Sequence, residues 1–215
     1  MKKNIVKKTF EMIDDLVDDN DNYKEFYNNY SKNIKLGIYE DNSNREKLTS
    51  YLRFYTSKSN GEELRSLDNY ISDMGEEQKE IYYITGESVE SVDLSPFVEK
   101  LKKQGKEVLY MTDAIDEYAL QQLKDYKGNK LVSITKDNLK LDDENEEDTK
   151  AHEELCKIIK ETLNDKVENV KLGQRIVDSP CCLVTSEFGW SANMERLMKA
   201  QALGDDQQKA FMISK

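Results

Sequence analysis

The chain has 215 residues, of which 35% are charged and 37% hydrophobic, and its 43 acidic and 32 basic residues leave a net charge of −11. An acidic chain has no general attraction to nucleic acid or to anionic lipid, so neither is expected as a partner. No apolar run approaches the roughly 20 residues that span a bilayer, so no membrane segment is expected. The basic start of the chain lacks the apolar segment of a secretory signal, and a cytoplasmic location is therefore expected.

The chain contains few of the histidine and cysteine residues that bind zinc or carry out redox chemistry. The chain holds one histidine, His152, and three cysteines, Cys156, Cys181 and Cys182, which are too few for a zinc site or a disulfide framework. We interpret Cys181 and Cys182 as neighbouring residues of a strand, one facing in and one facing out. The alternative is a thiol open to oxidative modification, which alkylation rates would distinguish. No metal site is expected.

Residues 1–75 are expected to be entirely helical. Apolar and aromatic residues recur at helical spacing on both sides of a polar break at 18–22. A loop is expected at 37–44, and a capping-box pattern at 59–62 predicts the start of a further helix. The four expected helices carry their apolar residues within 5–17, 23–30, 48–55 and 64–74.

From residue 76 the pattern changes to strands that alternate with helices. Short apolar runs at 81–85, 108–112 and 131–135 are typical of strands, and helical spacing returns at 94–101 and 115–123. The helical stretch 94–101 lies between the first two of these runs, and that helix is expected to end at Gly105. Alternation of this kind predicts a small parallel sheet with right-handed crossovers and helical cover.

The last third of the chain begins with an acidic run at 137–150. Its closely spaced carboxylates repel one another, which predicts a solvated linker, and the run lacks the ligand order and turn glycine of an EF-hand. Beyond it, the pattern predicts a helix at 155–163, paired strands at 167–172 and 175–185, and an amphipathic helix at 190–203. A second domain of mixed α and β type is therefore expected at 151–215.

The amphipathic helix that starts at Trp190 is the most informative stretch. Its spacing places four apolar residues on one stripe, and Ser191 can cap the first turn. Such a stripe is usually buried core. Two methionines beside the only tryptophan also suit a surface that adapts to many apolar partners. The residue types leave both interpretations open for the stripe, which consists of Trp190, Met194, Leu197 and Met198.

A nucleotide site has weaker support. The chain contains neither of the glycine-rich phosphate-binding motifs GxGxxG and GxxxxGK[ST]. The segment Thr85–Ser88 follows an expected strand and precedes a helix, at a position where α/β sheets often bind ligands. A helix cap is the simpler interpretation, since one glycine beside an acidic residue suits phosphate poorly. A small α/β nucleotide- or metabolite-binding module, acting after Thr85 and Thr112, is kept as the alternative function.

Five blocks of the sequence, in a fixed order, carry a family signature. They are Lys3–Lys8, Lys32–Gly37, Ile81–Ser88, Asp116–Ala119 and the run from Phe188 through the Trp190 helix. In this order they resemble the heat shock protein 90 chaperones over essentially the whole chain. The residues Ser191-Ala192-Asn193 after the tryptophan resemble the cytosolic branch of that family.

The resemblance implies a fragment of a larger ATP-dependent chaperone of mixed α/β fold. The ATP pocket and an arginine-bearing catalytic loop are expected upstream, so no catalytic residue and no cofactor are expected here, while the full-length family uses ATP and magnesium. The full-length family forms a homodimer through helices expected downstream, so a weak native dimer or none is expected here. The implied units are a helical connector of the middle domain at 1–75, a small three-layer αβα unit with a short parallel sheet at 76–136, an acidic linker at 137–150, and an incomplete α+β C-terminal domain at 151–215.

The resemblance also implies which residues bind partners. Family members use the helix that matches the Trp190 stripe in a client-binding surface, and basic residues of the helix that matches 1–17 in co-chaperone binding. The expected function is a non-catalytic segment that binds client proteins and co-chaperones and couples an upstream ATPase to a downstream dimer. A purely structural spacer between those two parts is a third hypothesis. The implied client-binding residues are Trp190, Met194, Leu197 and Met198, and the implied co-chaperone-binding residues are Lys3 and Lys7.

Overall fold

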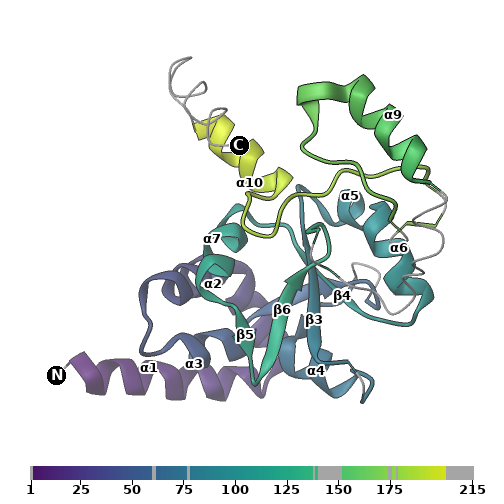
Figure 1. Ribbon diagram of the computed structural model, residues 1–215. Coiled ribbons are helices and arrows are strands. Elements are labelled where there is room, and N and C mark those ends of the chain that lie inside the picture. The colour runs from purple at the N-terminus through teal and green to yellow at the C-terminus, as the bar shows by residue number, and fades with distance from the viewer. Residues whose placement is uncertain are drawn as a thin grey trace.

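The chain opens with two long helices that meet at the predicted polar break. The computed structural model describes residues 2–59, 62–76, 78–137, 139, 152–173, 176–177 and 179–201. In it, α1 spans Lys2–Val17 and α2 spans Asn20–Glu40 (Figure 1). The Asp19 carboxylate accepts a hydrogen bond from the Asn22 amide at 3.3 Å, which caps the first turn of α2.

α2 continues through Gly37, so the loop predicted at 37–44 begins only after Glu40. A Cβ atom at Gly37 would lie 3.0 Å from Cδ1 of Leu48, which belongs to α3 (Arg45–Ser50). The missing side chain therefore lets α2 and α3 approach closely, and this packing outweighs the weak helix propensity of glycine.

Residues 53–66 contain two strands in a region that was predicted to be helical. β1 (Arg53–Thr56) pairs antiparallel with β2 (Arg65–Ser66) and, on its other side, with β4 (Val108–Met111). The predicted helix at 48–55 is wrong beyond Ser50, because the edge of β4 offers backbone partners to an extended segment. The next helix, α4 (Leu67–Ser72), begins at a capping box formed by Ser66 and Asn69 rather than at 59–62.

In the described part of the chain, six strands form one mixed sheet in the order β2-β1-β4-β3-β6-β5. β3 (Glu80–Thr85) pairs in parallel with β4 and with β6 (Asn129–Ser133), which confirms the predicted parallel strands, the third of them shifted by two residues. β5 (Asp125–Tyr126) adds an antiparallel strand beside β6. All of β4 is buried, which explains its continuous apolar run.

The central strands point alternate residues into two cores on opposite faces of the sheet. Ile81 and Leu109 pack with residues of α2, α4 and α7 (Ala114–Gln122). Tyr82 and Val108 pack on the other face with residues of α5 (Val89–Asp93) and α6 (Pro96–Lys103). Helices thus cover both faces (Figure 1), and the predicted mixed α/β class is confirmed.

The helix predicted at 94–101 begins only at Pro96, as α6, and Leu94 lies between α5 and α6 with 83% of its surface exposed. The end of α6 is as predicted. Gly105 has a φ of +71°, and the Lys106 amide donates to the Leu101 carbonyl at 2.9 Å, so the glycine closes the helix.

Beyond Lys136 the described chain holds α9 (Glu153–Leu163), the short η1 (Asn164–Lys166) and α10 (Ala192–Gln201). Most of the acidic run (138 and 140–150) and residues 202–215, which include the end of the predicted Trp190 helix, lie outside the described residues. None of the helices that the structure describes is both long and apolar enough to cross a bilayer.

The paired strands predicted at 167–172 and 175–185 are wrong for the described residues of that stretch. They contribute only one isolated parallel bridge, between Thr185 and Lys136. Leu183 is 82% exposed and Cys181 is exposed as well, so the stretch lacks the buried face that an independent strand pair needs. Cys181 and Cys182 are therefore not on a strand, and neither is part of a disulfide.

Candidate functional site at the carboxyl edge of the sheet

The segment 185–201 lies against the edge of the sheet where β3 and β6 end. The Thr185 amide donates to the Thr135 carbonyl at 3.2 Å, and the Asp137 amide donates to the Thr185 carbonyl at 3.0 Å. These two backbone bonds extend the line of β6 by one parallel bridge. They fix the start of the segment that leads to Trp190.

Lys136 holds the turn that follows. Its Nζ donates to the carbonyl of Ser186 at 3.1 Å and to the carbonyl of Gly189. The turn is tight, because a Cβ atom at Gly189 would lie 2.7 Å from the Ser186 hydroxyl oxygen. Burial lowers the pKa of Lys136, and the negative charge of Glu117 opposes that shift.

Glu117, on α7, accepts hydrogen bonds from residues at the start of α10. Its Oε1 accepts a hydrogen bond from the Ser191 hydroxyl at 2.6 Å and from the Asn193 amide group at 3.1 Å. The Ser191 oxygen in turn accepts from the Met194 amide at 2.9 Å, so the predicted cap of α10 is confirmed. Glu117 is 9% exposed and Asn193 is 8% exposed, which places these bonds away from solvent.

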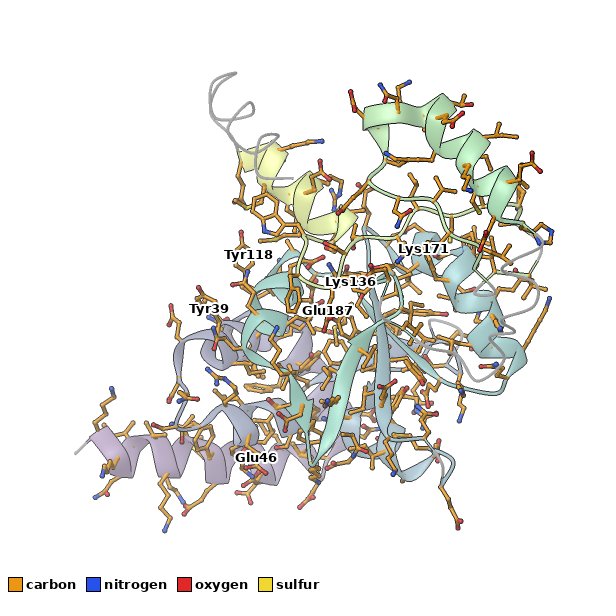
Figure 2. All side chains as sticks on the ribbon, viewed as in Figure 1. Tyr39, Glu46, Tyr118, Lys136, Lys171 and Glu187 are labelled. Atoms are coloured by element: carbon orange, nitrogen blue, oxygen red, sulfur yellow. The ribbon has the colours of Figure 1, made fainter. Side chains whose placement is uncertain are left out.

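Two contacts near the surface complete the arrangement. Arg196 Nε lies 2.8 Å from Oε1 of Glu87, in the turn that follows β3. The Tyr118 hydroxyl on α7 donates to Gln201 at 3.4 Å, and the Tyr118 ring meets Tyr39 edge-on. Figure 2 shows Tyr118 and Lys136 below α10, on the side of α10 that faces the sheet. The segment thus contacts the ends of β3 and β6 and the outer side of α7.

The predicted client-binding residues occupy different environments. Trp190 lies just before α10 rather than on it, and 41% of its surface is exposed. Met194 is only 7% exposed and anchors the helix inward, while Leu197 and Met198 are half-buried. Phe188, which the sequence reasoning did not select, is 94% exposed beside the tryptophan. Its place in the same sequence block was the signal that could have identified it.

Lys3 and Lys7 are on α1, at the other end of the molecule from α10 (Figure 1). Both side chains are exposed, and Lys7 lies 3.9 Å from Glu11 one turn further along the helix. The structure therefore keeps the two predicted partner surfaces apart.

A cavity of about 240 Å³ lies between α2, β1 and the end of β4, next to Thr112. Its inner wall holds Lys35, whose Nζ lies 2.6 Å from Asp113 and 2.7 Å from Asp116. The single positive charge of this lysine is already paired with two carboxylates, whose negative charge makes this part of the cavity a poor site for phosphate. Among the described residues, no group of three or more His, Cys, Asp and Glu side chains could hold a metal ion.

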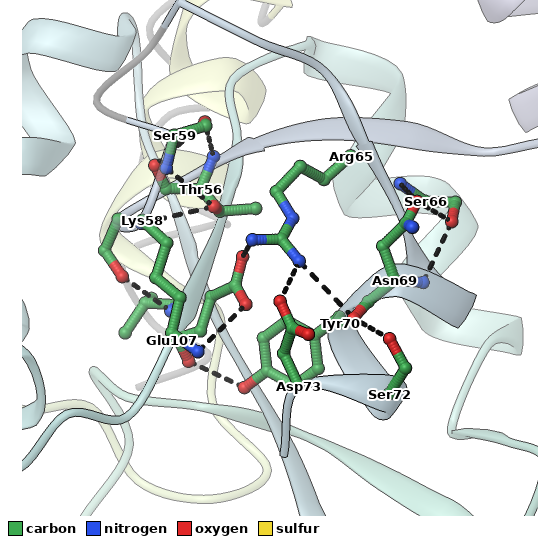
Figure 3. A network of polar contacts seen from close by, with 12 residues as sticks. Thr56, Lys58, Ser59, Arg65, Ser66, Asn69, Tyr70, Ser72, Asp73 and Glu107 are labelled. Carbon is green, nitrogen blue, oxygen red and sulfur yellow. Dashed lines mark hydrogen bonds and ion pairs between the residues drawn. The ribbon is translucent and has the colours of Figure 1, made fainter.

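Another polar cluster joins β1 and β2 to the neighbouring strands of the sheet (Figure 3). Glu107, just before β4, is 3% exposed, and its carboxylate lies 3.5 Å from Arg65 and 3.8 Å from Lys58. Its carbonyl accepts a hydrogen bond from the Tyr70 hydroxyl at 2.6 Å. These partners neutralise the buried carboxylate, so the cluster is interpreted as structural.

The fold corresponds to a known class of domain. A solved structure of the middle domain of a heat shock protein from Plasmodium falciparum aligns with a TM-score of 0.59 and 38% identity, covering 61% of this chain and 55% of that chain. The sheet and its helical cover therefore define a middle domain of the heat shock chaperone class.

The family follows from the sequence comparisons. The family described as Hsp90 protein matches residues 1–215, and the chain belongs to it. Heat shock protein 83 of Leishmania donovani is 47% identical over 221 residues, with 100% of this chain and 49% of the relative covered. Heat shock protein 90-5, chloroplastic, of Arabidopsis thaliana is 49% identical over 218 residues, with 99% of this chain and 28% of the relative covered.

These relatives also limit what the family membership implies. The chain spans less than half the length of each of the two relatives. A chloroplastic protein is as similar to this chain as the Leishmania protein is, so family membership does not fix the cellular compartment.

Proposed function

We propose that this chain is a non-catalytic middle and C-terminal segment of a cytoplasmic Hsp90-type chaperone. It contributes contacts to client proteins and co-chaperones, and it couples an upstream ATPase domain to a downstream dimerisation domain. The proposed division is a connector at 1–75, an αβα unit at 76–136, a linker at 137–150 and the start of a C-terminal domain at 151–215. β1 and β4 pair across the first boundary, which gives the connector and the αβα unit a common sheet for transmitting motion.

The observation that carries the client-binding proposal is the exposure of the aromatic pair before α10. Trp190 and Phe188 are 41% and 94% exposed, although large aromatic side chains are usually buried. Contacts to Glu117 and Lys136 hold the flanking backbone against a folded unit. A rigidly held aromatic surface binds apolar segments with little loss of conformational entropy. We assign Trp190 the main client contact, with Leu197 and Met198 beside it and Met194 as the inward anchor.

Reduced and carboxymethylated α-lactalbumin, which stays unfolded, is a suitable client probe. Trp190→Ala should weaken its binding by about tenfold or more, since truncation of a central aromatic residue often costs over 2 kcal/mol of binding free energy. The fluorescence anisotropy of the labelled probe measures this. Leu94→Ala removes an exposed apolar side chain elsewhere on the surface and serves as the control, because Leu94 is 83% exposed. Equal binding by Trp190→Ala and the unmodified chain would refute the client-binding role.

Co-chaperone binding is proposed for the exposed basic residues of α1. Lys3 and Lys7 face solvent, and opposite charges on a partner would steer association in a salt-dependent way. The variant Lys3→Glu with Lys7→Glu should lose binding to an acidic co-chaperone, while Lys24→Glu on α2 should retain it. Equal loss in both variants would indicate a general charge effect instead of a site on α1.

The second candidate function is a small α/β nucleotide- or metabolite-binding module, favoured only by the cavity next to Thr112. Under the first proposal the segment binds neither ATP nor magnesium, which are assigned to the upstream part of the full-length protein. Calorimetric titration with ATP and magnesium should then show no saturable heat. A saturable heat that Thr112→Val abolishes would favour the second candidate.

A further inference from the structure

Two side chains from the αβα unit hold the polypeptide on both sides of Trp190. Lys136 Nζ binds the carbonyls of Ser186 and Gly189, which precede the tryptophan. Glu117 Oε1 binds the side chains of Ser191 and Asn193, which follow it. We refer to Glu117 and Lys136 as the latch. The latch therefore holds the chain at residues directly before and directly after Trp190.

The latch is built from charged groups in a partly dry environment. Glu117 is 9% exposed, and hydrogen bonds to a carboxylate are stronger than those between neutral groups, more so away from water. The two latch residues carry opposite charges, and each interacts favourably with the other. By contrast, the pair of Arg196 with Glu87 has side chains that are 47% and 63% exposed, so solvent screens it. The latch therefore contributes more to the attachment of the segment than the Arg196–Glu87 pair does.

We propose that Glu117 and Lys136 are positioning residues that set the exposure of Trp190 and thereby the affinity for clients. With the latch closed, Trp190 is partly exposed and Met194 is buried. With the latch open, the segment leaves the sheet edge, and both side chains enter solvent. The exposure of Trp190 follows from the contacts alone, while its link to client affinity rests on the proposed function.

Intrinsic fluorescence provides a direct readout, because Trp190 is the only tryptophan in the chain. In Glu117→Ala the emission should shift to longer wavelength and become more accessible to quenching by acrylamide. Hydrogen exchange of the Thr185 and Asp137 amides gives a second readout, since both bond across the same junction. Their protection should fall by about tenfold, because the substitution removes a buried charged acceptor together with the two hydrogen bonds that it accepts.

Matched variants separate positioning from general stability. Glu117→Gln keeps an acceptor oxygen in place and should retain most of the protection, whereas Glu117→Ala should not. Glu87→Gln removes the exposed negative charge that faces Arg196 and should change protection by less than about twofold. Lys136→Met removes the bonds before Trp190 and should reproduce the fluorescence change of Glu117→Ala. If Glu117→Ala fails to fold, Asn193→Ala removes one donor from the opposite side without altering α7.

The outcomes distinguish the latch from the proposed function. Unchanged quenching and unchanged exchange in folded Glu117→Ala would overturn the latch, whatever the client affinity. Changed exposure together with changed binding of carboxymethylated α-lactalbumin supports the whole proposal. A third outcome is that Glu117→Ala changes the exposure of Trp190 but neither Glu117→Ala nor Trp190→Ala changes binding of the probe. That outcome would refute the client role and leave the latch intact.

Discussion

Lys35 in α2 places its ammonium group between two carboxylates of the following unit, at 2.6 Å from Asp113 and 2.7 Å from Asp116. Lys35 and Asp116 are 3% and 2% exposed. Lys35→Met keeps most of the side-chain volume but leaves both carboxylates without their cation. Since breaking a buried pair strands an uncompensated charge, the free energy of unfolding should fall by about 3–5 kcal/mol, which urea denaturation measures.

The chain offers a matched control for this prediction. Lys47 also lies 2.6 Å from a carboxylate, that of Asp14, but the two side chains are 43% and 48% exposed. Lys47→Met should therefore cost less than about 1 kcal/mol, because solvent screens a surface pair. Similar losses for the two variants would contradict the importance of burial.

The same cluster predicts a pH dependence. Burial raises the pKa of Asp116 to about 6 from an ordinary value of 3.8, while the facing Lys35 opposes the shift and Asp113 adds to it. A carboxyl whose pKa is higher in the folded chain contributes stability at low pH, and that contribution is lost as the pH rises through the folded pKa. The difference in unfolding free energy between the unmodified chain and Asp116→Asn should thus decrease between about pH 4 and pH 7.

Urea titrations of both proteins across this range measure that difference. Other carboxylates cancel in the subtraction as long as they lie far from the cluster. A difference that grew with pH would show that the charged form of Asp116 is the one the fold favours.

Among the elements, the strands that were predicted correctly differ physically from those that were missed. β3 and β4 are the two central strands of the sheet, and strands buried on both faces have apolar runs that local pattern reveals. β6, beside β3, is only partly buried, but its own short apolar run placed it to within two residues. β1 instead has apolar residues whose spacing also fits a helix. Its extended form depends on distant partners, namely the edge of β4 and the Tyr27 hydroxyl, which donates to the Arg53 carbonyl at 2.8 Å.

In the candidate site, too, the features set by nearby residues were predictable and those set by distant residues were not. The Ser191 cap was predictable, because a cap depends on residues three positions apart. The inward direction of Met194 also follows from local periodicity. Glu117 lies 74 residues before Ser191, and Lys136 lies 50 residues before Ser186, so nothing in the local pattern marks either as a partner. Tertiary structure alone brings them together.

The attachment of β1 and β2 can be tested through the cluster around Glu107. Arg65→Met should lower the free energy of unfolding by about 3 kcal/mol, because it leaves a buried carboxylate with a single cation. Lys58→Met removes a side chain that is 38% exposed and farther from Glu107, so its cost should be below about 1 kcal/mol. Hydrogen exchange at the Ser57 amide, which donates to the Val108 carbonyl at 2.9 Å, should report the same order. Equal effects would contradict the cluster's proposed role in holding the strand pair.

At the scale of the whole molecule, the net charge and the exposed apolar surface have opposite effects on self-association. No residue of α9 is buried, and Leu155 and Ile158 are 52% and 55% exposed. The net charge of −11 keeps copies of the chain apart through mutual repulsion. Salt screens that repulsion beyond about 10 Å at 0.1 M but leaves apolar attraction largely intact. Light scattering across a concentration series should therefore show weak self-association that increases with salt.

Two substitutions that leave the net charge unchanged test whether the association occurs through α9. Ile158→Asn should reduce the salt-induced rise in apparent mass, because it removes apolar area from the exposed face without changing the net charge. Leu94→Asn alters a side chain that is 83% exposed but lies between α5 and α6, and it should have no effect. A rise that both variants reduce equally would point to apolar surface in general. An apparent mass that falls as salt is added would instead indicate an ion-paired contact, because screening weakens the attraction between opposite charges.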